Sequence, residues 1–163
     1  MKRFDNRSEA GMRAYRCNSK VVSALAGGLL LAVGGVAAAK ECYAPDARAK
    51  ERAFSRAVIT SGGKTIWLGG QTARDPKGDF ETQVREVFAS LDKTIKAAGG
   101  SGLKDMVTMT VFINDVRLGD QFVKIRQETF KECFPASALI TVTGFARPGL
   151  LLEIQGVAVV DSK

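Results

Sequence analysis

Short runs of β-branched and aromatic residues recur along the C-terminal two thirds of the chain, and each of them predicts a strand. Residues 57–60 and 65–68 form two such runs, separated by Ser61-Gly62-Gly63-Lys64, a sequence typical of the turn of a β-hairpin. The run at 106–113 (MVTMTVFI) has apolar residues on both faces, so we expect this strand to be buried on both sides of a sheet.

The stretch between the second and third of these strands has the periodicity of an amphipathic helix. Its apolar positions, three or four residues apart, are Val84, Val87, Phe88, Leu91, Ile95 and Ala98. Asp79 or Thr82 is the candidate N-cap, because a short oxygen-bearing side chain can accept a hydrogen bond from a backbone N–H of the first turn. Gly99 and Gly100 predict the C-terminal end of this helix.

A second helix is expected over 120–133, with Pro135 ending it. Its inward-facing residues are expected to be Phe122, Ile125, Thr129 or Phe130, and Cys133. Two final strands are predicted at 138–143 and 150–160, on either side of a turn. The predicted order is therefore ββαβαββ, an α+β fold in which two helices pack on one face of a mixed sheet.

The last predicted strand is apolar on both of its faces. Leu152 and Ile154 alternate with polar residues on one side, and Val157 and Val159 lie on the other. Two helices on one side of the sheet can cover only one of these faces. We therefore expect the uncovered face to pack against another subunit, so the protein should be an oligomer.

The first 39 residues differ in composition from the rest of the chain. A basic stretch is followed by the uncharged run 21–39, which closes on Ala37-Ala38-Ala39. This order is typical of a secretory signal peptide, with cleavage expected after the last alanine. We expect an exported, periplasmic protein with a polar linker at 40–52 and one domain at 53–161. The alternatives are a membrane anchor, if the segment is retained, and a cytoplasmic protein.

The composition narrows the chemistry that such a domain can perform. Histidine is absent, so the Ser-His-acid triad, the Cys-His dyad and every histidine-ligated metal site are excluded. The net charge is +7, but residues 1–39 carry six basic and two acidic residues, whereas the remaining chain carries 18 and 15. The domain lacks the clustered basic stripe of a nucleic-acid-binding face, so we expect no nucleic-acid partner.

Two cysteines, Cys42 and Cys133, would remain after removal of the N-terminal segment. In an oxidising compartment these two residues can pair, but nothing in the sequence defines the distance between them. We expect the alternative, an unpaired Cys133 buried on the inner face of the second helix, because free cysteine is among the residue types that are most often buried.

Four segments, in this order along the chain, resemble the motifs of the RidA/YjgF family, the reactive-intermediate deaminases. They are residues 65–71 (TIWLGGQ), 109–115 (MTVFIND), 134–136 (FPA) and 152–159 (LEIQGVAV). The resemblance covers about residues 52–160. It implies a single chorismate-mutase-like domain and a homotrimer with small-molecule clefts between its subunits. Both features agree with the predicted element order and with the uncovered face of the sheet.

The resemblance also implies an activity. Members of the best-known type hydrolyse enamines and imines such as 2-aminoacrylate to a 2-keto acid and ammonia; no cofactor is needed, and no metal site is expected here. An arginine directly after the Pro-Ala pair binds the substrate carboxylate through its two-pronged guanidinium. A main-chain carbonyl orients the substrate nitrogen, and a glutamate on the last strand positions a water molecule.

These site residues carry over unevenly to this chain. Glu153 falls at the glutamate position, Leu139 at the position that supplies the carbonyl, and Gly69 and Gly70 in the tight strand turn that lines the cleft. The arginine is missing, because Ser137 follows the Pro-Ala pair. Serine cannot supply the positive charge that binds a carboxylate.

Two further positions differ from the family. Phe54 stands where a tyrosine is usual and lacks its hydroxyl, and Arg126 stands where many members have an asparagine on the second helix. Either Arg126 or Arg147 restores an anion-binding charge from another element, or the cleft takes a different small molecule and hydrolysis is weak or lost. Glu153 positions water, or it is an exposed carboxylate balanced by a neighbouring cation. The function is therefore that of a deaminase-like hydrolase with a non-standard cleft, or of a non-catalytic binding or protective trimer.

Overall fold

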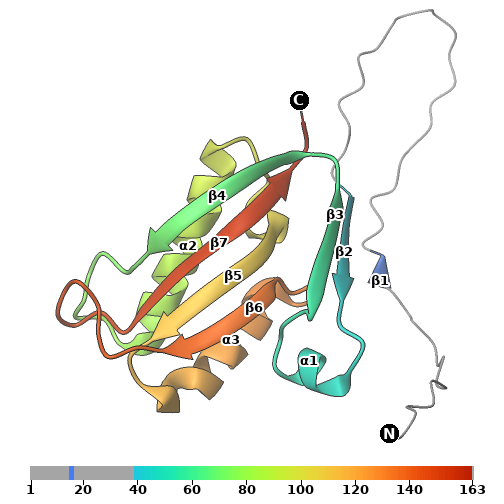
Figure 1. Cartoon of the computed structure of the whole chain (residues 1–163). Coiled ribbons are helices and arrows are strands. Elements are labelled where there is room, and N and C mark those ends of the chain that lie inside the picture. The colour runs from blue at the N-terminus through green and yellow to red at the C-terminus, as the bar shows by residue number, and fades with distance from the viewer. Residues whose placement is uncertain (1–14, 17–38, 163) are drawn as a thin grey trace, which may run out of the picture.

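The computed structural model describes residues 15–16 and 39–162, and its main element is a four-stranded mixed sheet. The strands lie in the order β4 (Lys64–Gln71), β7 (Leu152–Val160), β5 (Met106–Ile113) and β6 (Ala136–Thr141). β5 and β6 run parallel, and the other neighbours run antiparallel. The helices α2 (Phe80–Ala97) and α3 (Gly119–Phe130) lie behind one face of this sheet (Figure 1). The α+β class, the order ββαβαββ from β3 onward and the placement of both helices are confirmed.

The hydrophobic core lies between this sheet and the two helices. Leu152 and Ile154 of β7 pack there against Leu91 of α2 and Phe122 of α3, and all four are fully buried. Successive residues of a strand point to opposite faces of the sheet. The alternate residues of β4 and β6 therefore face away from the helices, as the exposed Trp67 (82%) and Ile140 (43%) do.

The two helices begin and end for identifiable reasons. Asp79, one of the two candidate N-caps of α2, accepts a hydrogen bond at Oδ1 from the backbone N–H of Thr82 at 2.8 Å. After α2 the chain turns at Gly99, which has a positive φ of 96°. α3 ends at Phe130, three residues earlier than expected, and Lys131 and Cys133 both have positive φ values. The prediction that Cys133 lies on the helix was therefore wrong.

The predicted β-hairpin does not form. β3 (Ala57–Ser61) and β4 follow one another through Gly62 and Gly63, which have φ values of 69° and 83°. β3, however, pairs with β2 (Ala39–Tyr43), which in turn pairs with the two-residue β1 (Tyr15–Arg16), so β3 and β4 belong to different sheets. β4 pairs with β7, which places the apolar side of β4 on the core. β3 pairs with β2, the strand that precedes it in the chain.

The segment 40–52, expected to be a polar linker, is part of the folded unit instead. It contains most of β2 and the short helix α1 (Ala47–Glu51). Asp46 caps this helix by accepting a hydrogen bond at Oδ1 from the N–H of Ala49 at 2.8 Å. α1 is anchored by a small residue, the fully buried Ala49, so its sequence lacks the apolar stripe that normally indicates a helix. Two 3₁₀ turns, η1 (Leu103–Asp105) and η2 (Val116–Leu118), complete the described elements.

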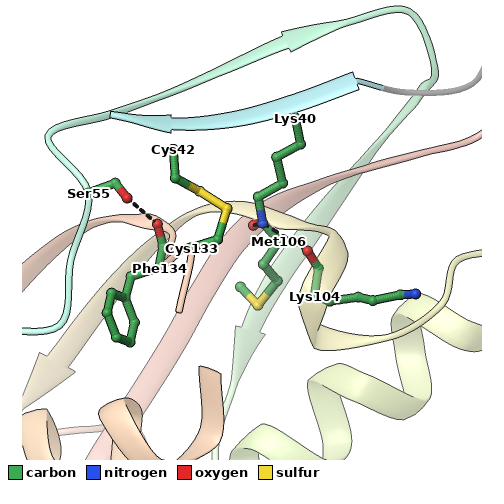
Figure 2. Close-up of a disulfide and its surroundings, with 7 residues drawn as sticks. All are labelled: Lys40, Cys42, Ser55, Lys104, Met106, Cys133 and Phe134. Atoms are coloured by element: carbon green, nitrogen blue, oxygen red, sulfur yellow. Dashed lines mark hydrogen bonds between the residues drawn. A yellow bond between two sulfur atoms is a disulfide. The ribbon is translucent and has the colours of Figure 1, made fainter. Parts of the chain in front are cut away.

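A disulfide joins Cys42 on β2 to Cys133, and their Cα atoms are 5.3 Å apart (Figure 2). The prediction of an unpaired Cys133 was wrong, because the chain turns back after α3 and carries this residue to β2. Two side-chain contacts add to the attachment. Lys40 Nζ donates to the backbone oxygen of Met106 at 2.7 Å, and Ser55 Oγ donates to that of Phe134 at 2.5 Å. β2 and the residues that follow α1 are therefore fixed to the rest of the domain at several points.

The uncharged run 21–39 lies outside the described residues except for Ala39, the first residue of β2. The predictions of a signal peptide and of a membrane anchor lie there too and remain predictions. Within the described part of the chain, no helix combines the length and the apolar character that crossing a bilayer requires.

Candidate functional site

A cavity of about 430 Å³ is lined by residues of α1, α3 and the edge strand β6, a volume typical of small-molecule sites. Half of its lining residues are arginines, namely Arg48, Arg52, Arg56 and Arg126. The other lining residues are Phe54, Val123, Ser137 and Leu139. Among the described residues, no acidic side chain lines this arginine cavity. Four of the predicted site residues are thus brought together, although they come from three separate parts of the chain.

Arg126 on α3 is the most deeply buried of these arginines, with 3% of the residue exposed. Its Nη1 donates a hydrogen bond to Ser137 Oγ at 2.5 Å, and its Nη2 donates to the backbone oxygen of Arg52 at 2.6 Å. The guanidinium carbon lies 5.1 Å from the centre of the Phe122 ring. α3 therefore supplies a guanidinium at the residue of β6 where the motif comparison found the arginine missing.

The charge of Arg126 is not balanced by a carboxylate among the described residues, and its buried Nε has no hydrogen-bond partner. Burial is the main cause that lowers the pKa of Arg126 to about 10, well below its ordinary value, and the nearby charge of Arg52 lowers it further. The side chain still carries its proton at neutral pH. A buried cation without an anion is costly, so an anionic ligand in the cavity would supply the missing interaction.

Arg147, the alternative source of positive charge, has a different position. Its Nη2 donates to the backbone oxygen of Ala73 at 2.7 Å and to Thr72 Oγ1 at 3.3 Å, and its Nη1 lies 3.5 Å from the backbone oxygen of Arg74. These contacts hold the loop that follows β4. Arg147 does not line the arginine cavity.

Glu153 and Gly70 form a second group of predicted site residues. The strand register between β4 and β7 is interrupted between Leu68 and Gln71, where Gly69 and Gly70 lie. A Cβ atom added to Gly70 would lie 1.8 Å from Glu153 Oε1, whereas one added to Gly69 would meet nothing within 4 Å. Gly70 thus makes room for the carboxylate, to which no described residue donates a hydrogen bond or forms an ion pair. The interpretation of Glu153 as a carboxylate balanced by a neighbouring cation therefore has no support within this part of the chain.

Residues 44–160 match the family model described as "Endoribonuclease L-PSP". The chain belongs to the RidA/YjgF family. A RutC family protein of Sulfurisphaera tokodaii is 32% identical over 116 residues, which cover 68% of this chain and 87% of that protein. The Rid-family protein YyfB of Yersinia pestis, described as of unknown function, has a similar structure with a TM-score of 0.65 at 23% identity, over 74% of this chain and 98% of its own. The related YyfA has a TM-score of 0.55 at 28% identity, over 66% and 87%. The predicted RidA-type, chorismate-mutase-like fold is confirmed.

In this RidA-family chain the two groups of site residues lie on opposite faces of the main sheet. Leu139 pairs with Val111, which pairs with Ile154, and the side chains of this row face the helices. Glu153 is adjacent to Ile154 in β7 and therefore points to the other face. Glu153 is also not among the residues that line the arginine cavity. Within one chain, the carboxylate and the cavity do not form one site.

Three arginines of the cavity were missed by the sequence analysis. Arg48, Arg52 and Arg56 fall in or next to the segment that had been interpreted as a linker, so they were not considered. Asp46, a good N-cap, is the signal that indicates a short helix, and this helix contains Arg48 and ends at its C-cap Arg52. Arg56 lies beyond the end of the helix, and no sequence signal places it beside the other two arginines.

Proposed function

We propose that this protein hydrolyses a small enamine or imine that carries a carboxylate, releasing a 2-keto acid and ammonia without a cofactor. The observation that carries the proposal is the buried guanidinium of Arg126, which lies 2.5 Å from Ser137 Oγ and has no carboxylate partner among the described residues. A carboxylate-bearing substrate would neutralise this charge through two parallel hydrogen bonds. The family's anion-binding function is thereby retained, although the arginine comes from a different element.

The chemistry needs a polarised C=N bond and a correctly placed water molecule. Water adds to the imine carbon and one of its protons passes through the Glu153 carboxylate to the nitrogen, which gives a carbinolamine. The hydroxyl proton of the carbinolamine then moves to the same nitrogen, and the C–N bond breaks to leave a ketone and ammonia. The backbone of Leu139 can orient the nitrogen, because β6 is an edge strand and its outer carbonyls have no partner strand in the main sheet. Each role thus falls to a group of this chain.

We infer that the complete site forms between subunits of a homotrimer. Glu153 and the arginine cavity lie on opposite faces of one sheet, so they act together only if Glu153 of one copy approaches the cavity of another. The open face of the sheet supports this assembly, since Trp67 is 82% exposed and Ile140 is 43% exposed. Three copies joined head to tail form a closed ring with three equivalent interfaces, and each interface would contain one complete site.

We also propose that the protein is exported. The basic and apolar order of residues 1–39 is that of a signal peptide, and the Cys42–Cys133 disulfide requires an oxidising compartment to persist. Mass spectrometry of the periplasmic fraction tests both points. A mature chain that begins near Lys40 and contains the disulfide is expected, whereas a cytoplasmic chain with both thiols reduced would contradict the proposal.

Release of keto acid and ammonia from freshly generated 2-aminoacrylate tests the activity. The parent protein is expected to exceed the buffer rate. Glu153→Gln should lower kcat by about 100-fold or more, because it removes the proton acceptor, and Arg126→Gln should mainly raise KM. Arg117→Gln removes an exposed guanidinium paired with Asp115 and is the matched control for charge. A parent rate equal to that of buffer would reject the proposed reaction.

Mixed trimers test whether the site is shared between subunits. At a substrate concentration far below the KM of the Arg126→Gln chain, the Arg126→Gln and Glu153→Gln chains each have little activity alone. Random co-assembly nevertheless gives about a quarter of the intersubunit sites one intact Arg126 and one intact Glu153 from different copies. We therefore expect about a quarter of the parental activity from equal co-expression. No recovered activity, or a stable monomer in sedimentation, would contradict the shared site.

A second candidate function is ligand binding without turnover. It is favoured by the separation between Glu153 and the arginine cavity within one chain. In that case Glu153→Gln leaves anion binding undiminished, and the parent releases no ammonia from any enamine tested. Efficient turnover that Glu153→Gln abolishes would exclude this alternative.

A further inference from the structure

We propose that the arginine cavity selects small molecules that carry two separate anionic groups, and that a short dicarboxylate is the class it fits best. The observation is the number and origin of its cations. Arg126 comes from α3, whereas Arg48, Arg52 and Arg56 come from α1 and the residues that follow it. A single carboxylate bound to Arg126 would leave the second group of cations without a ligand.

The carboxylates next to these arginines balance only part of their charge. Arg52 Nη1 lies 2.5 Å from Asp120 Oδ1, and Arg56 Nε lies 3.0 Å from Asp46 Oδ2. The pKa of Asp46 is lowered mainly by the hydrogen bond from the backbone N–H of Ala49, and the charges of Arg56 and Arg48 lower it further. Within the described part of the chain, two carboxylates therefore lie next to four guanidinium groups, and the excess of two positive charges matches a dianion.

The rest of the lining is apolar and suits a short carbon skeleton between two charged ends. Phe54, Val123 and Leu139 supply this surface. The guanidinium of Arg56 lies 5.5 Å from the centre of the Phe54 ring, so the aromatic ring also helps to hold one of the cations in place. The phenylalanine that replaces the family's tyrosine is thus part of this surface.

A dianion can be a dicarboxylate or a phosphate, because guanidinium groups bind both in a bidentate manner. The two groups of arginines come from different elements, which favours two separate anionic groups over the single compact charge of phosphate. The reaction of such a ligand rests on the proposed function. The substrate would be an imine or enamine whose skeleton ends in a second carboxylate, and water would convert it to a 2-keto dicarboxylate and ammonia.

Calorimetric titration of the full, disulfide-bonded protein tests the selectivity. Succinate and glutarate are compared with butyrate, a monocarboxylate of similar length, and with inorganic phosphate at the same moderate salt concentration. The dicarboxylates are expected to bind about tenfold or more tightly than butyrate, because one further charge-assisted contact is made. Equal affinities would overturn the inference, and so would tightest binding of phosphate.

Variants assign the two anionic groups to their arginines. Arg48→Gln is expected to lower the affinity for succinate about tenfold and to leave the affinity for butyrate unchanged. Arg126→Gln should lower the affinity for both ligands. The control, Arg117→Gln, should change neither affinity. An Arg48→Gln variant that binds succinate as tightly as the parent would contradict the inference. The inference and the proposed function can fail separately. Tight succinate binding without any ammonia release would contradict only the proposed function. Turnover of 2-aminoacrylate without a preference for dicarboxylates would contradict only the inference about selectivity.

Discussion

The arginine cavity and the Glu153–Gly70 pair are built in different ways, although both contain residues that the family motifs indicate. The cavity is assembled from three elements of one chain and contains a buried cation without an anion. The pair lies on the open face of the sheet, where the carboxylate has no hydrogen-bond or ion-pair partner in the described part of the chain. In the proposed trimer, the first region binds an anion within one chain, whereas the second acts only when a neighbouring subunit completes it.

The two regions differ in how strictly the position of the backbone fixes the charged group of the side chain. A guanidinium lies at the end of a long side chain, so Arg126 on α3 can place its charge next to Ser137 on β6. A strand carboxylate has no such freedom, because a shift of one residue moves it to the other face of the sheet. It also depends on Gly70, where a side chain would occupy its place.

Removing the disulfide is expected to have the largest effect on the free energy of unfolding. The disulfide fixes the segment that carries three arginines of the cavity, Arg48, Arg52 and Arg56. Replacing both Cys42 and Cys133 by serine removes a cross-link across 91 residues and should lower the free energy of unfolding by about 2–5 kcal/mol. Urea unfolding of parent and variant measures this loss. Reductant should destabilise the parent and leave the variant unchanged, and equal midpoints for both proteins would show that the cross-link contributes nothing.

The buried charge of Arg126 makes stability depend on pH in a defined window. Its pKa is lowered to about 10 in the folded state, so the unfolded chain, in which the guanidinium is solvated, holds the proton more tightly. The resulting penalty, on the order of 3 kcal/mol, is complete below pH 10 and becomes smaller as the pH rises above 10, because the folded state loses the proton before the unfolded chain does. Without anions, the parent should therefore gain stability relative to Arg126→Gln above pH 10.

Urea unfolding of both proteins between pH 8 and pH 11 measures this gain. Arg117→Gln is the control, because the pKa of Arg117 is raised by its hydrogen bond to Asp115 and does not fall into this window. Anion binding in the cavity should weaken over the same range, with a midpoint near pH 10. A stability difference that is independent of pH would contradict the burial of an unbalanced charge.

Gly70→Ala tests the second region by itself. The added methyl group must displace the Glu153 carboxylate, so turnover should fall by about 100-fold, while succinate binding in the cavity stays the same. Gly69→Ala is the matched change, since its Cβ meets nothing within 4 Å, and its loss of turnover should be much smaller. Equal losses for the two variants would indicate that the irregular strand, and not the contact with Glu153, is what matters.

Of these substitutions, Phe54→Leu is expected to have the smallest effect, and this effect is on ligand affinity. It removes the aromatic face beneath Arg56 but keeps an apolar lining, so succinate affinity should fall about two- to fivefold. Butyrate affinity should change less, because Arg126 does not contact this ring in the described structure. Calorimetric titration with both ligands checks the result, and an equal loss for both would assign Phe54 to general packing of the cavity.

The elements whose identity depends on local pattern were predicted well. α2 has the expected apolar face and begins at Asp79, and β5 has the predicted bounds of 106–113. Three expectations failed where the tertiary structure overrides the local pattern: β3 pairs with β2 and not with β4, residues 40–52 are folded, and Cys133 is paired and lies beyond the helix. All three cases involve the segment 40–52, which was interpreted as a polar linker and which contains most of β2, the helix α1 and Cys42.

The sequence alone determined the α+β element order and the family, because hydrophobic periodicity and short motifs depend on residues that are close together in the chain. Only the tertiary structure decided that Arg126 meets Ser137, that Cys42 meets Cys133 and that Glu153 faces away from the cavity. The physical reason is that side-chain contacts between separate elements depend on how the chain turns back on itself. Periodicity gives the face of an element on which a side chain lies, but it does not record which residues of a distant element that side chain will meet.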